Sequence, residues 1–337
     1  MTRVAVMGSG SFGTAIGMVM ADAGGDVGTW AREPEVAESI TKLHENPQYH
    51  PGIELPPSLW SSGDPATVLK GARIVVFSVP AQTLRENLAL WKPLIEPGAI
   101  LVSVMKGIEL GTTKRMSQVI AEVAEVPDSE VAVISGPNLA REIAQRQPAA
   151  TTVACTNADN AQELAAAATT AYFRPYWTPD IVGTELGGAV KNVIALANGM
   201  AYGLGFGENA QASLITRGLA EMSRLGAALG ANPMTFLGLA GIGDLIATCT
   251  SPLSRNRTFG ENLGRGLTVD ETIERTKQTC EGVKSCQAIL DLGNQNNVEM
   301  PITQEVVNVV HHGMSPRELL GNLMSRDLKP EQGSGAA

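Results

Sequence analysis

A single lysine, Lys191, lies in an otherwise apolar and glycine-rich stretch, Glu185–Asn198, which is typical of a buried helix. Burying a lysine is costly unless it has a partner or a task, because water no longer solvates the charge. Burial also lowers a lysine pKa toward neutrality, which suits general acid–base catalysis. Gly187 and Gly188 lie one turn earlier, so another backbone or a ligand can approach there. We expect Lys191 to be catalytic; the alternative is a lysine whose stem is buried while its charge reaches water.

Two polar groups later in the chain are candidates for the same cleft. Asp244 lies between apolar runs, either as the N-cap of a helix over Leu245–Cys249 or as a carboxylate partner for Lys191 or for a substrate hydroxyl. Ser254, Arg255 and Asn256 follow Ser-Pro at a predicted helix start. Hydroxyl, guanidinium and amide donors at a helix N-terminus favour a phosphate site, and the alternative is a capped, solvated helix start.

A glycine-rich turn, Gly8-Ser-Gly10-Ser-Phe-Gly13, stands between a predicted strand and a predicted helix. In a dinucleotide-binding turn, the first glycine permits the tight turn, the second lets the pyrophosphate approach, and the third lets the helix pack closely. Free N–H groups at the helix start then face the phosphates. The pattern predicts a nicotinamide dinucleotide; the alternative is a packing turn without a ligand.

The choice between NADH and NADPH depends on the end of the second predicted strand, at Trp30. An acidic residue there bonds the ribose 2′-hydroxyl, whereas an arginine pairs with a 2′-phosphate. Arg32 therefore favours NADPH, with NADH tolerated, and Glu33 either turns away or serves NADH.

Further polar residues follow predicted strand ends, where open α/β sheets bind ligands. Lys106 follows the strand run Ile100–Val104, and Gly136-Pro-Asn138 follows Val131–Ser135. We expect them to face the cleft. Lys114 and Arg115 lack such a position and are predicted to be surface charges.

The pattern of elements predicts two domains. Strands alternate with helices up to about residue 180, which indicates a Rossmann-type α/β domain (1–180) with a mainly parallel sheet covered on both faces. No convincing strand follows, so 181–330 is predicted to be an all-α substrate domain and 331–337 a disordered tail. The further strand runs are 74–79, 151–154 and 172–177, and the helices are 82–90, 113–123, 161–171, 182–203, 208–229, 254–264, 282–295, 301–311 and 315–323.

Composition excludes several classes of protein. The 337 residues are 44% hydrophobic and 18% charged with a net charge of −9, which indicates a folded chain and disfavours nucleic-acid binding. No run is apolar enough to span a membrane, and no signal peptide is evident, so we expect a cytoplasmic protein. The four cysteines lack zinc-ligand spacing and are predicted to be buried thiols, and no metal site is expected, the paired His311 and His312 included. The apolar, glycine-rich helices are compatible with a homodimer.

Taken together, the motifs closely resemble those of the bacterial-type NAD(P)-dependent glycerol-3-phosphate dehydrogenases, from about residue 3 to about 325. The matching segments, in order, are G-S-G-S-F-G-T-A (8–15), K-G-I-E (106–109), I-S-G-P (134–137), G-G-A-V-K-N-V-I-A (187–195), L-I-T-R-G-L-A-E-M-S-R-L-G (214–226), G-D-L-I-A-T-C-T (243–250), S-R-N-R (254–257) and E-G (281–282). The series is specific, whereas the glycine turn alone is not.

The resemblance implies reversible reduction of dihydroxyacetone phosphate to sn-glycerol 3-phosphate by NADPH or NADH, which supplies glycerophospholipid synthesis. It implies that Lys191 is the catalytic acid and base. The substrate contacts that it implies are Lys106, Gly136, Asp244, Ser254, Arg255 and Asn256, with Asn138 at a further position. The dinucleotide contacts are Ser11, Phe12, Arg32, Lys106, Ala140, Arg255 and Glu281, beside Gly8, Gly10 and Gly13.

The chain departs from the family pattern at two places. Asn138 stands where the family usually has Ser or Thr, and Thr279 and Cys280 stand where it tends to have aliphatic residues. These departures put the roles of Asn138 and Thr279 in doubt. Two other functions remain open from the residues: a two-domain dehydrogenase of another hydroxy acid or sugar acid, and a non-catalytic NAD(P)-sensing protein.

Overall fold

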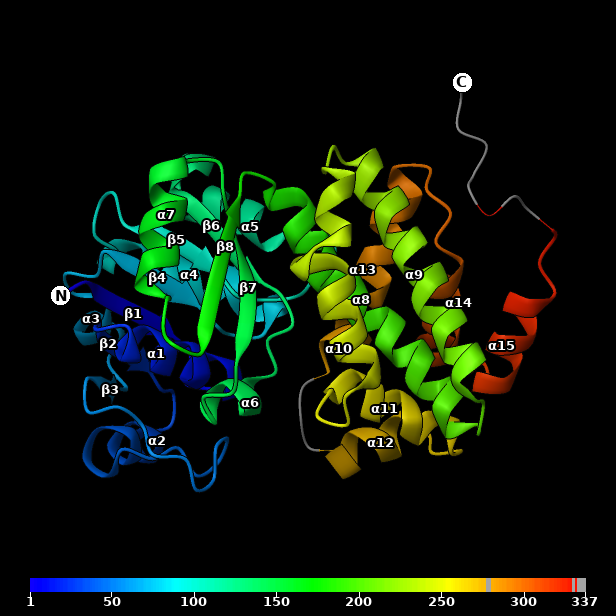
Figure 1. Ribbon diagram of the computed structural model, residues 1–337, viewed down its shortest axis with the longest axis horizontal. Helices are drawn as coiled ribbons and strands as arrows, with labels where there is room; N and C mark the ends of the chain where they lie inside the picture. The colour runs from blue at the N-terminus through cyan, green and yellow to red at the C-terminus, as the bar shows by residue number, and fades with distance from the viewer. Residues whose placement is uncertain (277–279, 329–330, 332–337) are drawn as a thin grey trace.

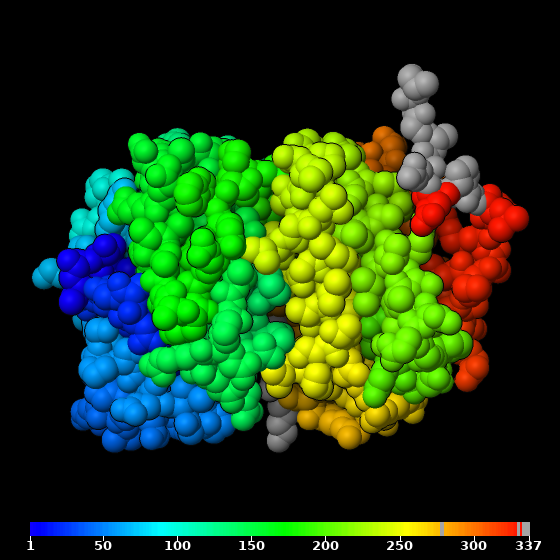
Figure 2. Space-filling view, viewed as in Figure 1, coloured from blue at the N-terminus to red at the C-terminus, as the bar shows by residue number. Residues whose placement is uncertain are grey.

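The computed structural model describes residues 1–276, 280–328 and 331, and it divides into a sheet half and a helical half (Figure 1). The chain passes from one to the other between the end of its last strand at Thr178 and the start of a long helix at Ile181. Figure 2 shows the two halves in contact along one seam, where green and yellow surfaces meet. Thr279, and all of the predicted tail except Glu331, lie outside the described residues.

The sheet has eight strands in the order β3-β2-β1-β4-β5-β6-β7-β8, and every neighbouring pair is parallel except β6 and β7. A mainly parallel sheet with a Rossmann-type beginning was expected and is confirmed. The strands are β1 (Arg3–Met7), β2 (Asp26–Trp30), β3 (Leu59–Ser62), β4 (Ile74–Phe77), β5 (Ile100–Ser103), β6 (Val131–Ser135), β7 (Ala149–Cys155) and β8 (Phe173–Thr178).

Both faces of the central strands β1, β4, β5 and β6 are buried, and for this reason they are continuous apolar runs, whereas the edge strand β8 alternates buried and exposed residues over its first half. In β1, Val4 and Val6 face one core while Ala5 and Met7 face the other. The helices that cover the two faces are α1 (Ser11–Asp22), α2 (Pro34–Glu38), α3 (Pro65–Leu69), α4 (Leu84–Trp91), α5 (Met116–Ala124), α6 (Ala140–Ala144) and α7 (Ala158–Ala167). The short turns between them are 3-10 helices at Ala81–Thr83, Lys92–Leu94 and Asp128–Glu130 and a π-helix at Ser39–Leu43.

Several of these elements were missed or misplaced in the sequence analysis. β3 reads Leu-Trp-Ser-Ser, which is too short and too polar to show the apolar run that marks the other strands. The helices α2, α3 and α6 have only five residues each, too few to show a helical period. The third predicted helix, at 161–171, begins three residues earlier and ends at Ala167.

The described residues after Thr178 contain no strand, as expected. The central helix α8 (Ile181–Gly203) is surrounded by others, and 20 of its 23 residues are buried, which explains why its sequence is apolar all round. Its neighbours are α9 (Glu208–Ala228), α10 (Asp244–Thr250), α11 (Arg255–Gly264), α13 (Glu281–Gln295), α14 (Pro301–His312) and α15 (Pro316–Met324), and α12 (Val269–Thr276) packs on α11. A 3-10 helix (Pro233–Leu237) and a π-helical turn (Leu239–Gly243) precede α10.

Glycines allow α8 and α11 to cross in backbone contact. A Cβ atom on Gly199 would lie 2.1 Å from the carbonyl oxygen of Arg257, and one on Gly260 would lie 2.1 Å from the carbonyl oxygen of Leu196. No side chain fits at either position. This crossing holds the start of α11, with its polar residues, against the helix that carries Lys191.

An ion pair joins the two halves, and it corrects one expectation. Arg115 was predicted to be a surface charge, but its guanidinium lies 2.5 Å from the Glu185 carboxylate and its side chain is only 16% exposed. Glu185, in the first part of α8, also accepts hydrogen bonds from the backbone N–H and the hydroxyl of Ser117 in α5. Sequence spacing could not reveal this contact, because its partners are 70 residues apart.

Within the described residues, no helix is both long and apolar enough to cross a membrane.

The glycine crossing gives a stability test. Gly260→Ala places a methyl group on the backbone of α8, so we expect the free energy of unfolding to fall by about 1–3 kcal/mol or more. Urea denaturation measures it. Gly321→Ala is the control, because this exposed glycine in α15 has nothing within 4 Å of its Cβ position. There the change should be neutral or stabilising by up to about 1 kcal/mol. Equal stability of the two variants would contradict the crossing.

Candidate active site

Three charged side chains from three parts of the chain meet where the two halves touch. The Lys191 ammonium group lies 2.5 Å from one oxygen of the Asp244 carboxylate, and the Lys106 ammonium group lies 2.6 Å from the other. Lys191 comes from α8, Asp244 begins α10, and Lys106 follows β5. Lys191 and Asp244 are buried, and the Lys106 side chain is 16% exposed. One carboxylate therefore lies between two ammonium groups.

The structure decides between the two expectations for Asp244. The N-cap of α10 is Gly243, and the carboxylate of Asp244 caps no backbone amide there. It is instead the partner of Lys191, as the second alternative required. The same carboxylate excludes the snorkelling alternative for Lys191, because the ammonium group is buried and paired rather than extended into water.

A fourth residue, Thr248, was missed by the sequence analysis. Lys191 Nζ donates to Thr248 Oγ1 at 2.5 Å, and this hydroxyl donates to Asp244 at 3.2 Å. Thr248 lies four residues after Asp244 on the same helix, so the two side chains share one face. A search for polar side chains four residues from Asp244 could therefore have found Thr248 from the sequence.

The environment shifts the titration of Lys191. Its pKa falls from 10.5 to about 8, chiefly because burial disfavours the charged form; the Asp244 carboxylate opposes this shift, and the neighbouring charge of Lys106 adds to it. At neutral pH the amine is protonated, and it releases its proton within a pH range accessible to an enzyme. This is the behaviour expected of a general acid that also acts as a base.

The loop after β6 contributes a backbone carbonyl rather than a side chain. Lys106 Nζ donates to the carbonyl oxygen of Gly136 at 3.0 Å. The Asn138 amide donates to Thr151 Oγ1 on β7 at 2.7 Å, and its own carbonyl oxygen is buried and has no partner among the described residues. Asn138 is thus tied to the sheet, and no contact joins it to Lys191.

At the start of α11, two of the three predicted phosphate ligands also make hydrogen bonds within the protein. Ser254 is buried and its hydroxyl oxygen accepts a hydrogen bond from the Arg257 backbone N–H, so it caps the helix as the alternative expected, although the cap itself is buried rather than solvated. The Asn256 amide donates to Asn192 at 2.8 Å and its oxygen accepts from the Gly282 backbone N–H at 3.0 Å. One amide hydrogen of Asn256 is left for a ligand.

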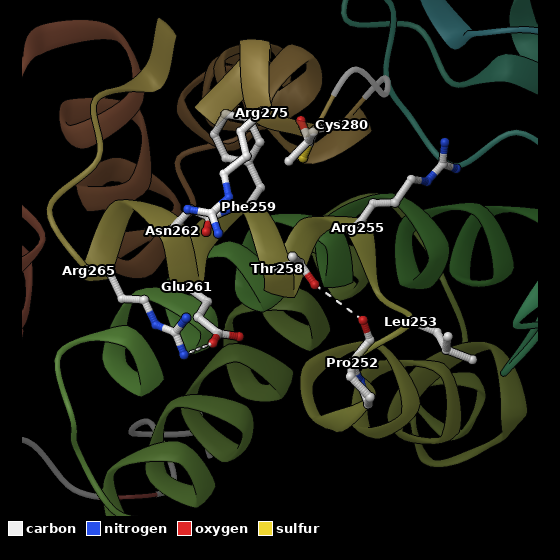
Figure 3. Close-up of a pocket in the computed structure, with 11 residues that line it drawn as sticks. Pro252, Leu253, Arg255, Thr258, Phe259, Glu261, Asn262, Arg265, Arg275 and Cys280 are labelled. Carbon is white, nitrogen blue, oxygen red and sulfur yellow. Dashed lines mark hydrogen bonds and ion pairs between the residues drawn. The ribbon is translucent and has the colours of Figure 1, made fainter. Parts of the chain in front are cut away.

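Arg255 is different from its neighbours. It is exposed and makes no hydrogen bond or ion pair within the described residues. Figure 3 shows its side chain extending away from Arg265, which is turned toward Glu261. The pocket drawn there, of about 470 Å³, lies beside α11 and α12. Arg255 is the free cation that the sequence analysis assigned to a phosphate.

Glu281 begins α13 and lies close to Arg255 and to the loop after β5. Burial raises the pKa of its carboxyl group, and the backbone of Ala81 and the charge of Arg255 offset this in part. One of its oxygens is buried without a hydrogen-bond partner among the described residues. A buried carboxylate oxygen with spare capacity is a suitable acceptor for an amide N–H of a bound molecule.

The glycine turn has the geometry that a pyrophosphate requires. Gly8 has a φ of +132°, and a Cβ there would lie 2.4 Å from the carbonyl oxygen of Ser78 at the end of β4. A Cβ on Gly13 would lie 1.9 Å from the carbonyl oxygen of Gly8. Nothing lies within 4 Å of the Cβ position of Gly10, so open space faces the N-terminus of α1. These residues fit a dinucleotide, because the helix start is open while the turn behind it is filled.

The other predicted dinucleotide contacts lie around this turn. Ser11 begins α1, and Phe12 and Ala140 pack on the same core where α6 lies against α1. Arg32, after β2, is 80% exposed and its guanidinium lies 2.6 Å from Glu33. The two residues that were alternatives for ribose recognition therefore pair with each other.

Among the described residues, neither the cysteines nor the histidines form a further candidate metal or disulfide site. All four cysteines are buried and free, as expected, and burial raises the thiol pKa of Cys249, Cys280 and Cys286 to about 12. His311 lies 3.4 Å from the sulfur of Cys286. Within the described part of the chain, no group of three or more His, Cys, Asp or Glu side chains is placed to hold a metal ion.

The chain matches two family models that together span nearly all of it. The one described as NAD-dependent glycerol-3-phosphate dehydrogenase N-terminus matches residues 3–161, and the one described as the C-terminus of the same enzyme matches residues 180–321.

Curated relatives and a solved structure agree with these matches. A protein of Streptomyces griseus subsp. griseus, named glycerol-3-phosphate dehydrogenase with NAD(P)+ as coenzyme, is 59% identical over 330 residues, which cover 98% of each chain. A protein of the same name from Thermobifida fusca is 60% identical over 333 residues, covering 98% of this chain and 99% of its own. The crystal structure of glycerol-3-phosphate dehydrogenase from Coxiella burnetii superimposes with a TM-score of 0.91 at 36% identity and covers 96% of this chain and 98% of that one.

The shared carboxylate gives the second test. Asp244→Asn keeps the size of the side chain but leaves the buried Lys191 ammonium group without a counter-charge. We expect the free energy of unfolding at pH 7 to fall by about 3–5 kcal/mol. The loss should shrink as the pH rises toward the Lys191 pKa of about 8 and level off above it, because without its carboxylate the lysine releases its proton at a lower pH than in the wild type, and the neutral amine needs no partner.

Urea denaturation at several pH values measures this dependence. Asp159→Asn, an exposed change in the first turn of α7, serves as the control and should cost no more than about 0.5 kcal/mol. A loss from Asp244→Asn that does not change with pH would show that the carboxylate supports something other than Lys191.

Proposed function

The chain belongs to the NAD-dependent glycerol-3-phosphate dehydrogenase family, and from that premise we propose how its own side chains reduce dihydroxyacetone phosphate to sn-glycerol 3-phosphate with NAD(P)H, reversibly. The observation that carries the proposal is the buried Lys191, paired with Asp244 and beside Lys106. β1, β4, β5 and β6 are parallel neighbours, so their carboxyl ends bring the glycine turn, Lys106 and Gly136 to one edge of the sheet.

Lys191 is proposed as the acid that protonates the substrate oxygen. The bound reduced nicotinamide supplies the hydride. As the ketone becomes an alcohol, negative charge develops on its oxygen, and the Lys191 ammonium group donates a proton to it. In the reverse direction the neutral amine accepts the alcohol proton. Asp244 and Thr248 hold the amine in position, because both bond directly to Nζ.

Lys106 is proposed to orient the substrate beside Lys191. Its ammonium group is bonded to Asp244 and to the carbonyl oxygen of Gly136, which leaves one N–H for a ligand. Two ammonium groups on one carboxylate leave a net positive charge. This net positive charge favours the binding of an anionic substrate and stabilises the developing oxyanion.

The substrate phosphate is assigned to Arg255, with the remaining amide hydrogen of Asn256 as a second donor. Arg255 has no partner to give up among the described residues, and a guanidinium group binds phosphate oxygens with two parallel hydrogen bonds. The Ser254 hydroxyl oxygen caps the helix, which holds the helix start in place, and its O–H hydrogen stays free to donate to the phosphate as a third donor. Fixing the phosphate places the carbonyl group near Lys191.

The dinucleotide is assigned to the open start of α1. The backbone N–H groups of Gly10, Ser11 and Phe12 would face its phosphates. The resemblance to the family assigns Glu281 and Ala140 to the dinucleotide as well. Arg32 and Glu33 would read the ribose: Glu33 is available to a 2′-hydroxyl, and Arg32 to a 2′-phosphate once their ion pair opens. This favours NADPH with NADH tolerated. The homodimer, the cytoplasmic setting and the supply of lipid synthesis stay predictions.

The reaction is tested by the loss of reduced-nicotinamide absorbance when dihydroxyacetone phosphate is added to protein and NADPH, and then to protein and NADH. We expect rapid loss with the wild type, and at least about a 10²-fold lower kcat for Lys191→Met with NADPH binding retained. Because the pKa of Lys191 is about 8, the rate of ketone reduction should fall above that pH, and the rate of alcohol oxidation should rise through it. A folded wild type that oxidises neither cofactor refutes the substrate, and a normal kcat for Lys191→Met refutes the acid.

The phosphate assignment has its own test. Arg255→Ala should raise the KM for dihydroxyacetone phosphate by about 10-fold or more with a smaller effect on kcat, because the lost contacts bind substrate and transition state alike. Arg265→Ala is the matched control, since this arginine of the same helix region is paired with Glu261. Equal KM values for the two variants would remove Arg255 from the phosphate site.

A further inference from the structure

We propose that Asn46 is a positioning residue for the dinucleotide: it sets the direction of the Gly10 backbone N–H in the glycine turn. Asn46 lies 36 residues after Gly10, in the segment between the π-helix at Ser39–Leu43 and β3, and no motif of the sequence analysis includes it. The inference rests on the proposed function, because it concerns how the same cofactor is held.

Asn46 is fully buried behind the turn. Its amide nitrogen donates to the carbonyl oxygen of Ser9 at 3.0 Å and to Thr14 Oγ1 at 2.9 Å. The Thr14 hydroxyl in turn donates to the same Ser9 carbonyl at 3.2 Å. Both acceptors belong to the turn and the first helical turn behind it, not to the segment that carries Asn46.

The hydrogen bonds of α1 do not fix the orientation of the Ser9 carbonyl group, so this orientation depends on the donors of Asn46 and Thr14. Gly10 is the N-cap of α1, and the first helical hydrogen bond runs from Thr14 N–H to the Gly10 carbonyl. Ser9 therefore lies outside the helix, where its peptide plane is free to rotate unless a side chain holds it.

When the carbonyl oxygen of a trans peptide group is held on one side, the N–H of the same peptide group points to the opposite side. The peptide bond is planar and trans, so the Ser9 C=O and the Gly10 N–H point in opposite directions. With the carbonyl held toward Asn46, the Gly10 N–H faces away from the segment. Nothing lies within 4 Å of the Gly10 Cβ position, so the amide stands beside open space.

His50 adds a second contact from the same segment. It is 2% exposed, and its Nε2 lies 2.7 Å from the carbonyl oxygen of Ser11 in the first turn of α1. Burial lowers the pKa of His50, so the ring is neutral at pH 7 and donates from Nε2, since a carbonyl only accepts. The backbone carbonyl of Asn46 accepts from the His50 backbone N–H at 2.8 Å, so the two residues belong to one hydrogen-bonded turn.

Packing alone does not require these polar contacts. Ile40 and Leu55, before and after Asn46, are buried in the core and already anchor the segment. Both hydrogen bonds that the buried Asn46 amide donates end on the glycine turn and the start of α1. The amide therefore orients the turn and adds little apolar packing. Removing it should therefore disturb cofactor binding more than folding.

The closing experiment measures NADPH binding directly, by fluorescence titration without substrate. We expect Asn46→Ala to raise the Kd for NADPH about tenfold, as for a weakened hydrogen bond to a charged group. At saturating NADPH, kcat and the KM for dihydroxyacetone phosphate should stay within about twofold of wild type. The Kd for ADP-ribose, which keeps the pyrophosphate, should rise equally, and that for 2′-AMP, which lacks it, should not change.

Asn160→Ala is the matched control. Asn160 also donates its amide to a backbone carbonyl, that of Ser129, in the same half of the molecule but away from the turn. Asn46→Leu is the second variant if Asn46→Ala does not fold, because it keeps nearly the same size and removes the N–H donors without burying a charge. Unchanged NADPH binding by the folded Asn46 variant, or equal weakening in the Asn160 control, overturns the inference. A wild type that does not bind NADPH overturns the proposed function instead.

Discussion

The structure depends on one buried charge. An ammonium group on a helix that is buried on all sides is destabilising unless a carboxylate reaches it, and Asp244 is the carboxylate that does so for Lys191. To place Asp244 there, the chain must bring α10 against α8. Because Asp244 also binds Lys106, the same carboxylate ties the helical half to the loop after β5. The lysine that we propose as the catalytic acid and the contact between the halves are thus parts of one arrangement.

Glycines make this arrangement possible by letting backbones approach α8. A Cβ on Gly187 would lie 2.1 Å from the carbonyl oxygen of Ala240, in the turn that leads to Asp244. One on Gly188 would lie 2.7 Å from the Ser135 hydroxyl oxygen and 3.3 Å from the stem of Lys106. The expected close approach one turn before Lys191 is therefore made by the backbone at one position and by side chains from the sheet half at the other.

The polar groups near the site divide into those that are already bonded and those that retain capacity. The Ser254 hydroxyl oxygen caps α11, the Asn138 amide nitrogen donates to Thr151, and Thr248 accepts from Lys191, whereas the Asn138 carbonyl oxygen has no partner among the described residues. Arg255 and one oxygen of Glu281 have no hydrogen-bond partner among the described residues, and they lie on α11 and α13 beside the contact between the halves. A binding site needs both kinds: bonded residues fix the geometry, and the others recognise the ligand.

The sequence by itself determined the features that local pattern carries. Apolar strand runs that alternate with helices indicated the parallel sheet, and helical stretches without strands indicated the second half. The isolation of Lys191 in an apolar, glycine-rich helix predicted a functional role for it. Short elements such as β3, without a visible period, could not be predicted. Only the tertiary structure decided which groups pair: that Asp244 binds both lysines, that Arg115 binds Glu185, and that Asn46 reaches the glycine turn. Such contacts join residues tens of positions apart, and their geometry depends on how whole elements pack, which no local pattern records.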